Sequence, residues 1–489
     1  MKQLLIAILL FPILTRATNY DYPTGGNNNV HVGNGTFGTA LHAGDTVRIW
    51  PYGGGAGWRS HGYDSLNSGV DGQYIVIKWM PGAFIIPNSG GQLQANYLNN
   101  CNGVKFVGIT MNDNVDVLFF SLGSSLQYMK FIWFDSITLR RSAGFGLFYS
   151  GSFPAFNGDT TKCFRHWKFT HITADSLAPG GTGFGTGIGI GKQTTNGFWL
   201  DVEIAYSTFS NYESTSGPST YIGAINVYNL NIHHNTFSNL GMNVASPSGH
   251  AASIGANQCK YQIHDNVFGP NNFGNDVRGK QVDLPVAGTA YTGRSLWYNN
   301  ISHHKRKYAM VESQLADTSN IGNYARRRTT PEIWNNTCYS FAVGVCCAPY
   351  TASIIDCYNN DTVTLKNNLY SVLSDTIWTI NTVINSNPVK NALITLPNGP
   401  VSNYDTSNNR FVQFFSGSGL ADTTTFRPLK SGTLYNAGLA VPSYITSDQY
   451  GTARPLIYRG GSGVDIGAVQ YLDAIVSPPC RKCKIIVSH

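Results

Sequence analysis

Two short segments of the sequence carry polar side chains that would do chemistry if they lay side by side. The segments are 276–280 (Asp-Val-Arg-Gly-Lys) and 308–312 (Tyr-Ala-Met-Val-Glu). In both, apolar or small residues alternate with larger ones, which predicts β-strands with one buried face and one outward face. The polar residues expected on the outward face are Asp276, Arg278, Lys280, Tyr308 and Glu312, with Lys280 beside Glu312.

This set matches what β-elimination on a uronic-acid polysaccharide requires, namely a carboxylate-binding group, a base and an acid. Arg278 would bind the sugar carboxylate through two hydrogen bonds. Lys280 would remove the proton beside that carboxylate. Tyr308, or His250 just before a similar segment, would protonate the leaving oxygen. Lys280, Arg278, His250 and Tyr308 are thus the predicted catalytic residues.

Other side chains complete the predicted site. Asp276 and Glu312 would hold Ca²⁺, a hard cation that prefers oxygen ligands. Asn226 and Tyr228, at outward positions of the equivalent segment 224–228, would contact the substrate. The alternative interpretation of the whole set is a solvated polar face with an ordinary cross-strand ion pair.

The placement of these segments follows from a repeat that runs along the chain. Each copy begins with apolar residues at alternate positions. Two polar residues and then an Asn or a small residue follow, and the copy ends at an apolar residue. The copies begin at Val104, Met129, Trp167, Val202, Leu230, Tyr261, Leu296, Glu332 and Val363. Their spacing of about 25 to 38 residues lies in the range of solenoid proteins.

The Asn position of the repeat has a structural interpretation. Asn tolerates turn conformations and bonds to neighbouring backbone groups, so equivalent Asn residues on stacked coils would form a ladder at one corner. The candidates are Asn235, Asn266, Asn300 (or Asn299), Asn336 and Asn368. Charged residues are only 12% of the chain, which also favours a β-rich protein with many turns over a helical one.

Both ends of the chain resemble the pectin-lyase-like superfamily. The segment 41–49 (Leu-His-Ala-Gly-Asp-Thr-Val-Arg-Ile), followed by 72–78, is similar to the opening coil of secreted bacterial members, and 463–471 (Gly-Val-Asp-Ile-Gly-Ala-Val-Gln-Tyr) is similar to their closing phrase. The resemblance implies an all-β, single-stranded right-handed parallel β-helix. Members include lyases, hydrolases, epimerases and binding proteins. Alginate lyases and chondroitinase B use a Lys, an Arg and acidic calcium ligands, which implies similar roles for the candidates above.

Two alternatives to a lyase stay open. Gly249-His250-Ala251 and Arg278-Gly-Lys280 are similar to motifs of pectin-type hydrolases on this fold, but no paired carboxylates precede them at suitable spacing. The second alternative is a carbohydrate-binding or adhesive β-helix whose exposed Trp and Tyr side chains stack on sugar rings.

The N-terminus predicts export. Lys2 precedes an apolar run from Leu4 to Leu14, and small residues follow near position 17. We expect a signal peptide over 1–17, a β-helix domain with an N-terminal cap over 18–475, and a tail over 476–489. The apolar run is too short for a membrane span. A secreted location, extracellular or periplasmic, and a net charge of +7 favour an acidic polysaccharide as partner rather than nucleic acid.

Overall fold

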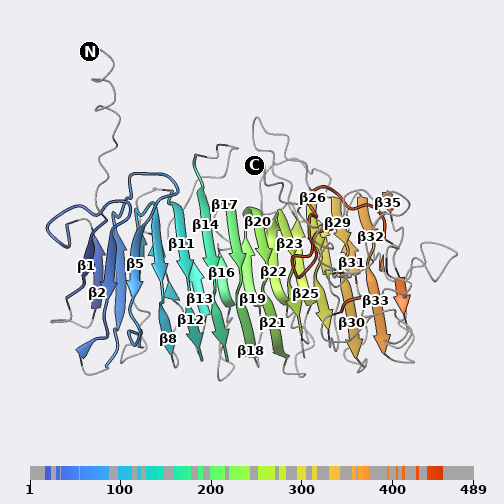
Figure 1. Cartoon of the computed structure of the whole chain (residues 1–489), viewed down its shortest axis with the longest axis horizontal. Helices are drawn as coiled ribbons and strands as arrows, with labels where there is room; N and C mark the ends of the chain where they lie inside the picture. Colours follow the sequence, from blue (N-terminus) through green and yellow to red (C-terminus); the bar gives the residue numbers. More distant parts are fainter. Residues whose placement is uncertain are drawn as a thin grey trace, which may run out of the picture.

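A computed structural model shows stacked coils of a parallel β-helix along one long axis (Figure 1). The structure describes residues 17–23, 29–33, 35–53, 56–86, 97–112, 118–119, 121–122, 128–141, 144–147, 159, 161–177, 186–190, 199–214, 220–242, 252–269, 275–281, 294–303, 311–315, 330–341, 355–358, 362–373, 394–395, 403–405, 410–412, 426–428, 435, 438–454 and 468.

Three long parallel sheets form the walls of the helix. The first sheet has 13 strands: β1 (Asn19–Asp21), β3 (Thr46–Ile49), β5 (Ile75–Trp79), β7 (Val104–Val107), β11 (Lys130–Asp135), β14 (Phe164–Thr170), β17 (Trp199–Ala205), β20 (Val227–His233), β23 (Tyr261–His264), β26 (Arg294–Tyr298), β29 (Thr330–Trp334), β32 (Thr362–Lys366) and β35 (Asn403–Asp405). The second sheet has 10 strands: β8 (Thr110–Asn112), β12 (Thr138–Arg140), β15 (Thr173–Asp175), β18 (Thr208–Ser214), β21 (Thr236–Met242), β24 (Val267–Phe268), β27 (Ile301–His303), β30 (Thr337–Phe341), β33 (Leu369–Leu373) and β36 (Arg410–Val412).

The third sheet has 9 strands: β9 (Leu118–Phe119), β13 (Gly144–Leu147), β16 (Thr186–Ile190), β19 (Thr220–Ile225), β22 (Ala252–Cys259), β25 (Asn275–Gln281), β28 (Val311–Leu315), β31 (Ile355–Tyr358) and β34 (Ile394–Thr395). A short sheet near the N-terminus contains β2 (Asn29–Gly33), β4 (Ser60–Asp64), β6 (Tyr97–Asn99) and β10 (Ser121–Leu122). In the three long sheets the strands stack in chain order, which confirms the predicted all-β, right-handed parallel β-helix. Among the described residues, no helix is long and apolar enough to cross a membrane.

The core forms by stacking equivalent apolar residues from coil to coil. In the second sheet, Phe209, Phe237 and Phe268 are fully buried, and their successive ring centroids lie 5.1 and 4.9 Å apart. The alternation of apolar residues in the repeat puts one such residue inward at the same place on every coil. Each coil therefore buries its apolar face against its two neighbours, as a solenoid requires.

A sharp corner joins each strand of the first sheet to a strand of the second. One residue per coil has a left-handed backbone there, with φ between 52 and 57°: Ser136, His171, Tyr206, His234, Asp265, Asn299, Asn335 and Asn367. We call this set the corner column. On the coil before Ser136 the equivalent residue is Gly108, where an added Cβ would lie 2.7 Å from the carbonyl oxygen of Trp79.

The predicted asparagine ladder is confirmed, with Asn300 rather than Asn299 as its member. The backbone N–H of Asn235 donates to Asn266 Oδ1 at 3.0 Å, and that of Asn266 donates to Asn300 Oδ1 at 3.1 Å. The same bond continues from Asn300 to Asn336 at 2.9 Å and from Asn336 to Asn368 at 3.0 Å. These side chains are almost completely buried, so the ladder satisfies polar groups that water cannot reach.

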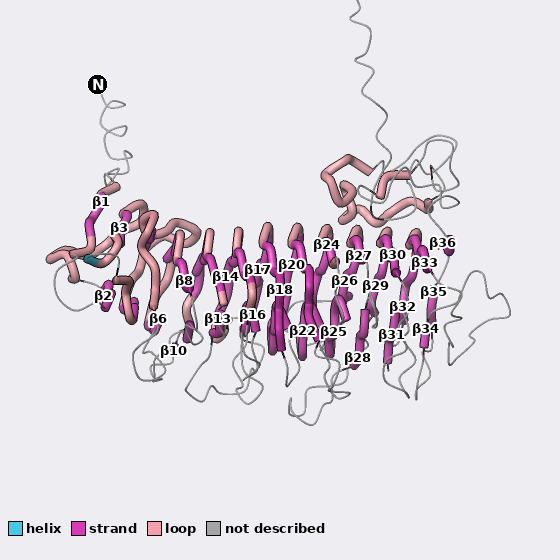
Figure 2. Tube along the Cα trace, turned by 90° about the horizontal axis from the view of Figure 1, so that it is seen from below, coloured by secondary structure: helices cyan, strands magenta, loops and turns pink. Residues whose placement is uncertain are grey.

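Residues 438–454, here called the C-terminal strap, leave the coils and run beside the first sheet (Figure 2). Val441, Tyr444 and Ile445 of the strap pack against the outward side chains of the first sheet, namely Leu296, Tyr298 and Trp334. The predicted domain bounds, with the β-helix extending to residue 475, stay a prediction; among the described residues, β36 is the last strand that continues the coils.

Candidate functional site

The predicted catalytic strand exists as β25 of the third sheet. Val277 occupies the register position of Ile254, and Gly279 occupies that of Ala256. Ile254 and Ala256 are both fully buried. The register therefore agrees with the predicted alternation, in which positions 277 and 279 belong to the inward columns of the helix.

The predicted pairing between β25 and β28 is wrong by two residues. Arg278 pairs with Glu312, whereas Lys280 pairs with Gln314. The expectation that Lys280 lies beside Glu312 therefore fails, and Glu312 is the register neighbour of Arg278. Apolar alternation has a period of two, so a shift by two residues keeps every inward position inward and leaves no trace in the pattern.

The predicted calcium ligands lie on these same two strands. Glu312 pairs with Arg278 on one side and with Asp356 on the other, so Arg278, Glu312 and Asp356 occupy one column on successive coils. Asp276 lies two residues before Arg278 along β25. A calcium site at Asp276 and Glu312 stays a prediction.

The two residues predicted to contact substrate do not share a strand with one another or a sheet with Arg278. Asn226 lies between β19 and β20 with a φ of 59°, and it is 8% exposed. Tyr228 lies in β20 of the first sheet and is 3% exposed. The predicted strand 224–228 was wrong because the chain turns within it. His250 and Tyr308 lie outside the described residues.

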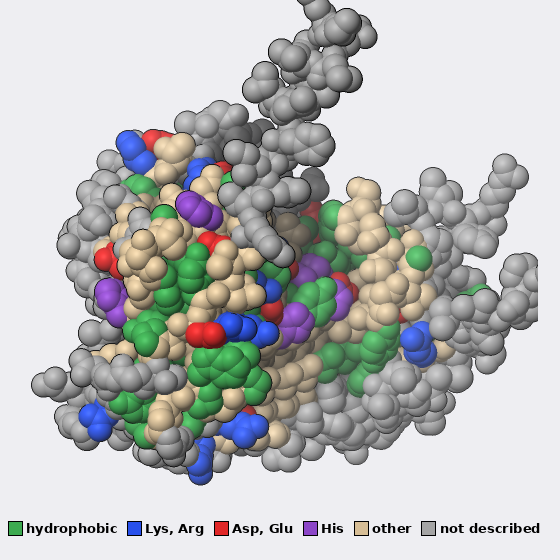
Figure 3. Space-filling view, turned by 60° about the vertical axis from the view of Figure 1, so that its left-hand side comes forward, with side chains coloured by type: hydrophobic (Ala, Val, Ile, Leu, Met, Phe, Trp, Pro, Cys, Tyr) green, Lys and Arg blue, Asp and Glu red, His purple; other side chains and the backbone are tan. Residues whose placement is uncertain are grey.

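A second polar surface, which the sequence interpretation missed, follows the corner column. Ser136, His171, Tyr206 and His234 are exposed at the same corner of successive coils. Figure 3 shows histidine, acidic and basic side chains gathered in a hollow of the surface. A left-handed backbone is uncommon for residues other than glycine and is unfavourable for a bulky residue such as Tyr206, and such backbone strain often accompanies function.

Three of the four exposed corner residues, His171, Tyr206 and His234, stack as flat rings. The rings of His171 and Tyr206 lie 5.7 Å apart at an angle of 17°, and those of Tyr206 and His234 lie 5.1 Å apart at 26°. Each ring stacks on the next ring through its face, so a ligand reaches the rings through the polar groups at their edges. These edges bear imidazole nitrogens and a phenolic hydroxyl at the spacing of the coils, about 4.8 Å.

A second stack of rings lies beside the first and is buried or half-buried. His233, His264 and Tyr298 occupy one column of the first sheet, with ring centroids 5.0 and 4.6 Å apart and nearly parallel planes. Burial raises the pKa of the Tyr298 hydroxyl well above its usual value, so this phenol stays protonated. The buried stack holds His233 in one orientation beside His234.

A chain of polar contacts runs from Lys168 to His234. Lys168 Nζ lies 2.8 Å from Glu203, Glu203 lies 3.4 Å from His233 Nε2, and His233 Nδ1 lies 2.9 Å from His234 Nδ1. Hydrogen bonding from His233, opposed by burial and aided by Lys168, lowers the pKa of Glu203 to about 2. Glu203 is therefore a carboxylate at neutral pH and accepts hydrogen bonds only.

This carboxylate assigns the tautomers of both imidazoles. When the His233 ring carries a single proton, that proton lies on Nε2 and is donated to Glu203, so Nδ1 accepts. His234 then donates from Nδ1, which leaves a lone pair on its Nε2. Burial lowers the pKa of His234, in spite of the nearby Asp265 carboxylate, so the neutral form is favoured. His234 is thus an exposed, oriented imidazole that is able to accept a proton.

His171 has a related arrangement. Its Nδ1 lies 2.8 Å from Asp135 Oδ1, and Asp135 also binds Lys105 Nζ at 2.8 Å and the Thr170 hydroxyl at 2.9 Å. Although burial acts to raise the pKa of Asp135, hydrogen bonds from Lys105, His171 and Thr170 lower it overall. The carboxylate again accepts a hydrogen bond from the Nδ1–H group, so a His171 ring that carries one proton has its lone pair on Nε2.

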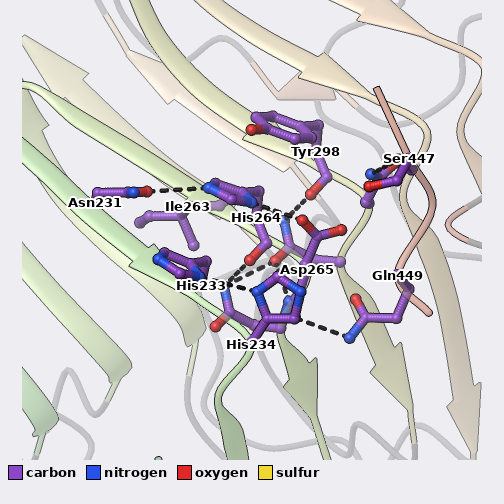
Figure 4. A network of polar contacts seen from close by, with 12 residues as sticks. Asn231, His233, His234, Ile263, His264, Asp265, Tyr298, Ser447 and Gln449 are labelled. Atoms are coloured by element: carbon purple, nitrogen blue, oxygen red, sulfur yellow. Dashed lines mark hydrogen bonds and ion pairs between the residues drawn. The ribbon is translucent and has the colours of Figure 1, made fainter. Parts of the chain in front are cut away.

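On the other side of His234, the strap meets the corner column at Asp265 (Figure 4). Gln449 Nε2 donates to the Asp265 carbonyl oxygen at 2.8 Å, and His264 Nδ1 lies 2.7 Å from Asp265 Oδ2. Asp265 Oδ1 and Gln449 Oε1 are buried and have no hydrogen-bond partner within the described structure. A buried acceptor that makes no hydrogen bond lowers the stability of the fold, so packing alone does not explain the residues at this junction.

The sequence does contain a signal for this surface. If the repeat copies are aligned on the ladder Asn, the residue before it in successive copies is His171, Tyr206, His234 and Asp265, with His171 and Tyr206 aligned through their neighbours Ile172 and Ser207. The polar positions of the phrase were interpreted as turn residues only. Turn chemistry explains Asn and Asp at such a position, but it does not explain Tyr206.

Comparisons with known proteins do not assign the site. No protein-family model matches the chain, and no curated protein matches its sequence. Within the described ranges, no three or more His, Cys, Asp or Glu side chains are grouped to hold a metal ion.

Proposed function

We propose that the protein is a secreted, polysaccharide-active β-helix of the pectin-lyase-like type, and that it cleaves an acidic polysaccharide by β-elimination at His234. The observation that carries the proposal is the contact chain from Glu203 through His233 to His234, which leaves an exposed basic nitrogen. A general base needs a pKa near or below the working pH together with a fixed orientation. Both are present at His234.

The reaction uses neighbouring groups of the corner column. His234 Nε2 takes the proton from the carbon next to the sugar carboxylate, and the electron pair of that bond forms a carbon–carbon double bond. The bond to the glycosidic oxygen breaks, and the departing oxygen takes the phenolic proton of Tyr206, whose ring lies 5.1 Å from that of His234. Proton return from His234 to Tyr206 through solvent restores both groups.

The described carboxylates of this surface favour elimination over hydrolysis. Glycoside hydrolysis needs two carboxyl groups free to act as acid and as nucleophile or base. Asp135 and Glu203 are each held by a lysine and a histidine, and Asp265 is held by His264. A base of the imidazole type with a phenol beside it suits elimination better.

Hydrolysis has a separate candidate place in the third sheet. There the register aligns Glu312 with Asp356 on the next coil, about 4.8 Å away along the axis. Glycoside hydrolysis uses a pair of carboxyl residues, and the register aligns these two acidic residues on neighbouring strands. The predicted lyase residues Arg278 and Lys280 lie on the neighbouring strand β25, so this sheet is the alternative site for either reaction.

The test is a cleavage assay on alginate, pectate, chondroitin sulfate and heparin. Elimination gives an unsaturated product that absorbs ultraviolet light, whereas hydrolysis gives new reducing ends without that absorbance. We expect His234→Asn to lower the rate about 10²- to 10⁴-fold, because the base is lost while an amide keeps the contact to His233. Tyr206→Phe, which keeps the ring stack, should lower it by a similar order.

The matched control is the double variant Arg278→Ala/Lys280→Ala. We expect it to cleave at the wild-type rate, because these residues lie on another sheet. If the double variant is inactive and His234→Asn is not, the site belongs to the third sheet. Retained polysaccharide binding without any cleavage by the wild type would instead identify a binding protein.

A further inference from the structure

The corner column changes abruptly between two successive coils. Ser136, His171, Tyr206 and His234 are exposed, and the His171 side chain reaches 59% exposure. Their equivalents Asp265, Asn299, Asn335 and Asn367 are all buried. The exposed half of the column therefore ends at His234, one coil spacing of about 4.8 Å before Asp265.

The strap is what covers the buried half. Asn367 donates to the Leu439 carbonyl oxygen at 2.9 Å and accepts from the Leu439 N–H at 2.7 Å. Asn299 donates to the Ser447 carbonyl oxygen at 2.6 Å. These amides sit where His and Tyr sit on earlier coils, so the strap is docked along the direct continuation of the hollow.

Apolar packing fixes the strap in addition to these hydrogen bonds. Leu296, Tyr298 and Trp334 occupy outward positions of the first sheet and are 7 to 8% exposed beneath strap residues Val441 and Ile445. On the preceding coils the same columns hold polar residues such as Glu203 and His233. The covered coils are thus built to bind the strap and not a sugar.

We propose that the strap closes one end of the hollow along the exposed corner residues, here called the groove. The protein then binds a chain end of its polysaccharide and shortens the polymer from that end. This inference rests on the proposed function. A linear polymer that lies along the exposed rings meets the strap just beyond His234, where Gln449 is bonded to Asp265. Only a short stretch of polymer fits between His234 and the strap, so each cleavage releases a short oligosaccharide.

The first test is the stoichiometry of binding to size-fractionated alginate, with pectate in parallel, using the His234→Asn variant to prevent cleavage. A chain-end site binds one protein per polymer end, whatever the polymer length. We therefore expect the number of proteins bound per chain to stay constant between short and long fractions. A number that rises in proportion to length would overturn the inference.

The second test is the product profile of the wild type. From the first time points we expect short oligosaccharides and little loss of viscosity, whereas internal cleavage gives long fragments and a rapid loss of viscosity. Cleavage with internal-type products refutes chain-end binding but leaves the proposed lyase intact. No cleavage and no binding of either polymer refutes the proposed function itself, and chain-end binding with it.

A pair of variants tests the role of the strap. Asn299→Gly/Gln449→Ala removes the contacts that hold the strap next to the groove, and Asn367→Gly removes contacts at its far end. Glycine keeps the left-handed backbone at both Asn positions. We expect longer products, by at least about twofold in mean length, from the first variant and unchanged products from the second. Unchanged products from both would show that the strap does not limit substrate length.

Discussion

The two halves of the corner column have the same backbone conformation but differ in the exposure and the type of their side chains. From Ser136 to His234 the column presents exposed side chains, three of which are rings, whereas from Asp265 to Asn367 it is buried beneath the strap. The same left-handed conformation serves both halves, with φ between 52 and 57°. The asparagine ladder runs beneath the covered half and reaches the exposed half only at Asn235, because Ser207 and Ile172 occupy its position on the two earlier coils.

This difference shows how a solenoid separates fold from function. The inward ladder position joins successive coils, so its side chain has to bond buried backbone groups, as Ser207 and Asn235 onwards do. The outward corner position is free of that requirement, and its side chain decides whether a coil binds a ligand or binds the strap. An Asn at that position forms a pair of amide hydrogen bonds with another backbone, as Asn367 does with Leu439.

The largest expected effect tests the shared element. The two variants are Asn235→Ala and Asn336→Ala. Asn235 lies under the exposed half of the column, and Asn336 lies under the covered half. Each removes a buried amide that bonds two coils, so we expect each to lower the free energy of unfolding by about 3 kcal/mol. Denaturant unfolding followed by circular dichroism measures both. A loss confined to one of them would mean that the ladder does not support the two halves equally.

The next effect concerns the exposed half alone. Glu203→Gln introduces an amide that is able to donate, so the His233 tautomer is no longer fixed and His234 Nε2 is no longer always the acceptor. We expect a loss of cleavage rate of about 10²-fold with little change in stability. The matched variant Glu332→Gln, on the covered half, should leave the rate unchanged, although its partner Tyr444 lies 2.7 Å away. Equal losses in both variants would point to a general effect of charge.

A smaller effect concerns the covered half alone. Asn367→Gly removes both hydrogen bonds to Leu439 and keeps the backbone conformation. We expect the strap to open more easily by about 1–2 kcal/mol, measured as faster hydrogen exchange over residues 438–454. Ser136→Gly, the same change on the exposed half, should leave that exchange unaltered. Unaltered exchange in both variants would mean that apolar packing alone holds the strap.

The fold was predictable because its signals are local and repeated. The alternation around Leu230 and Tyr261 predicts a strand, and the recurring Asn at 235 and 266 predicts a corner on every coil. A residue type that recurs at the same position in many copies is a stronger signal than its occurrence in any single copy. The ladder was therefore identified residue by residue before its geometry was known.

The site was less predictable, for two physical reasons. The predicted pairing of Lys280 with Glu312 was wrong because the register is set by loop lengths and by packing between coils. The alternation of apolar residues is the same after a shift by two residues, so it does not reveal the register. His234 was overlooked because its role depends on His233 and on Glu203 from the preceding coil, which are 1 and 31 residues away in the chain. A contact between coils leaves no local trace in the sequence.

The strap left a signal that was not used. Leu296, Tyr298 and Trp334 stand at outward positions where the earlier coils carry polar residues. Apolar residues on both faces of a strand indicate that both faces are covered. The sequence therefore marks where a covering segment begins, although it does not say which segment covers it.

The smallest expected effect is a pH dependence that belongs to the exposed half. Burial lowers the pKa of His234 below its ordinary value of 6.5. The unfolded chain then binds more protons than the folded chain just below pH 6.5, so stability must fall as the pH drops through that window. Protonation also fills the Nε2 lone pair, so the cleavage rate should fall as the pH drops through the lowered pKa.

Glu203 acts in a separate and more acidic window. Its pKa is lowered from 4.5 to about 2, so its contribution to stability is complete above pH 4.5 and is lost as the pH falls towards 2. Titration of stability and rate in the wild type and in His234→Asn separates the two. In the variant, the fall in stability that begins near pH 6.5 should become smaller, because only the lowered pKa of His166 then contributes to it, and the fall below pH 4.5 should stay. If the fall near pH 6.5 is as large in the variant as in the wild type, another group controls it, and His234 is not the residue that must be neutral for cleavage.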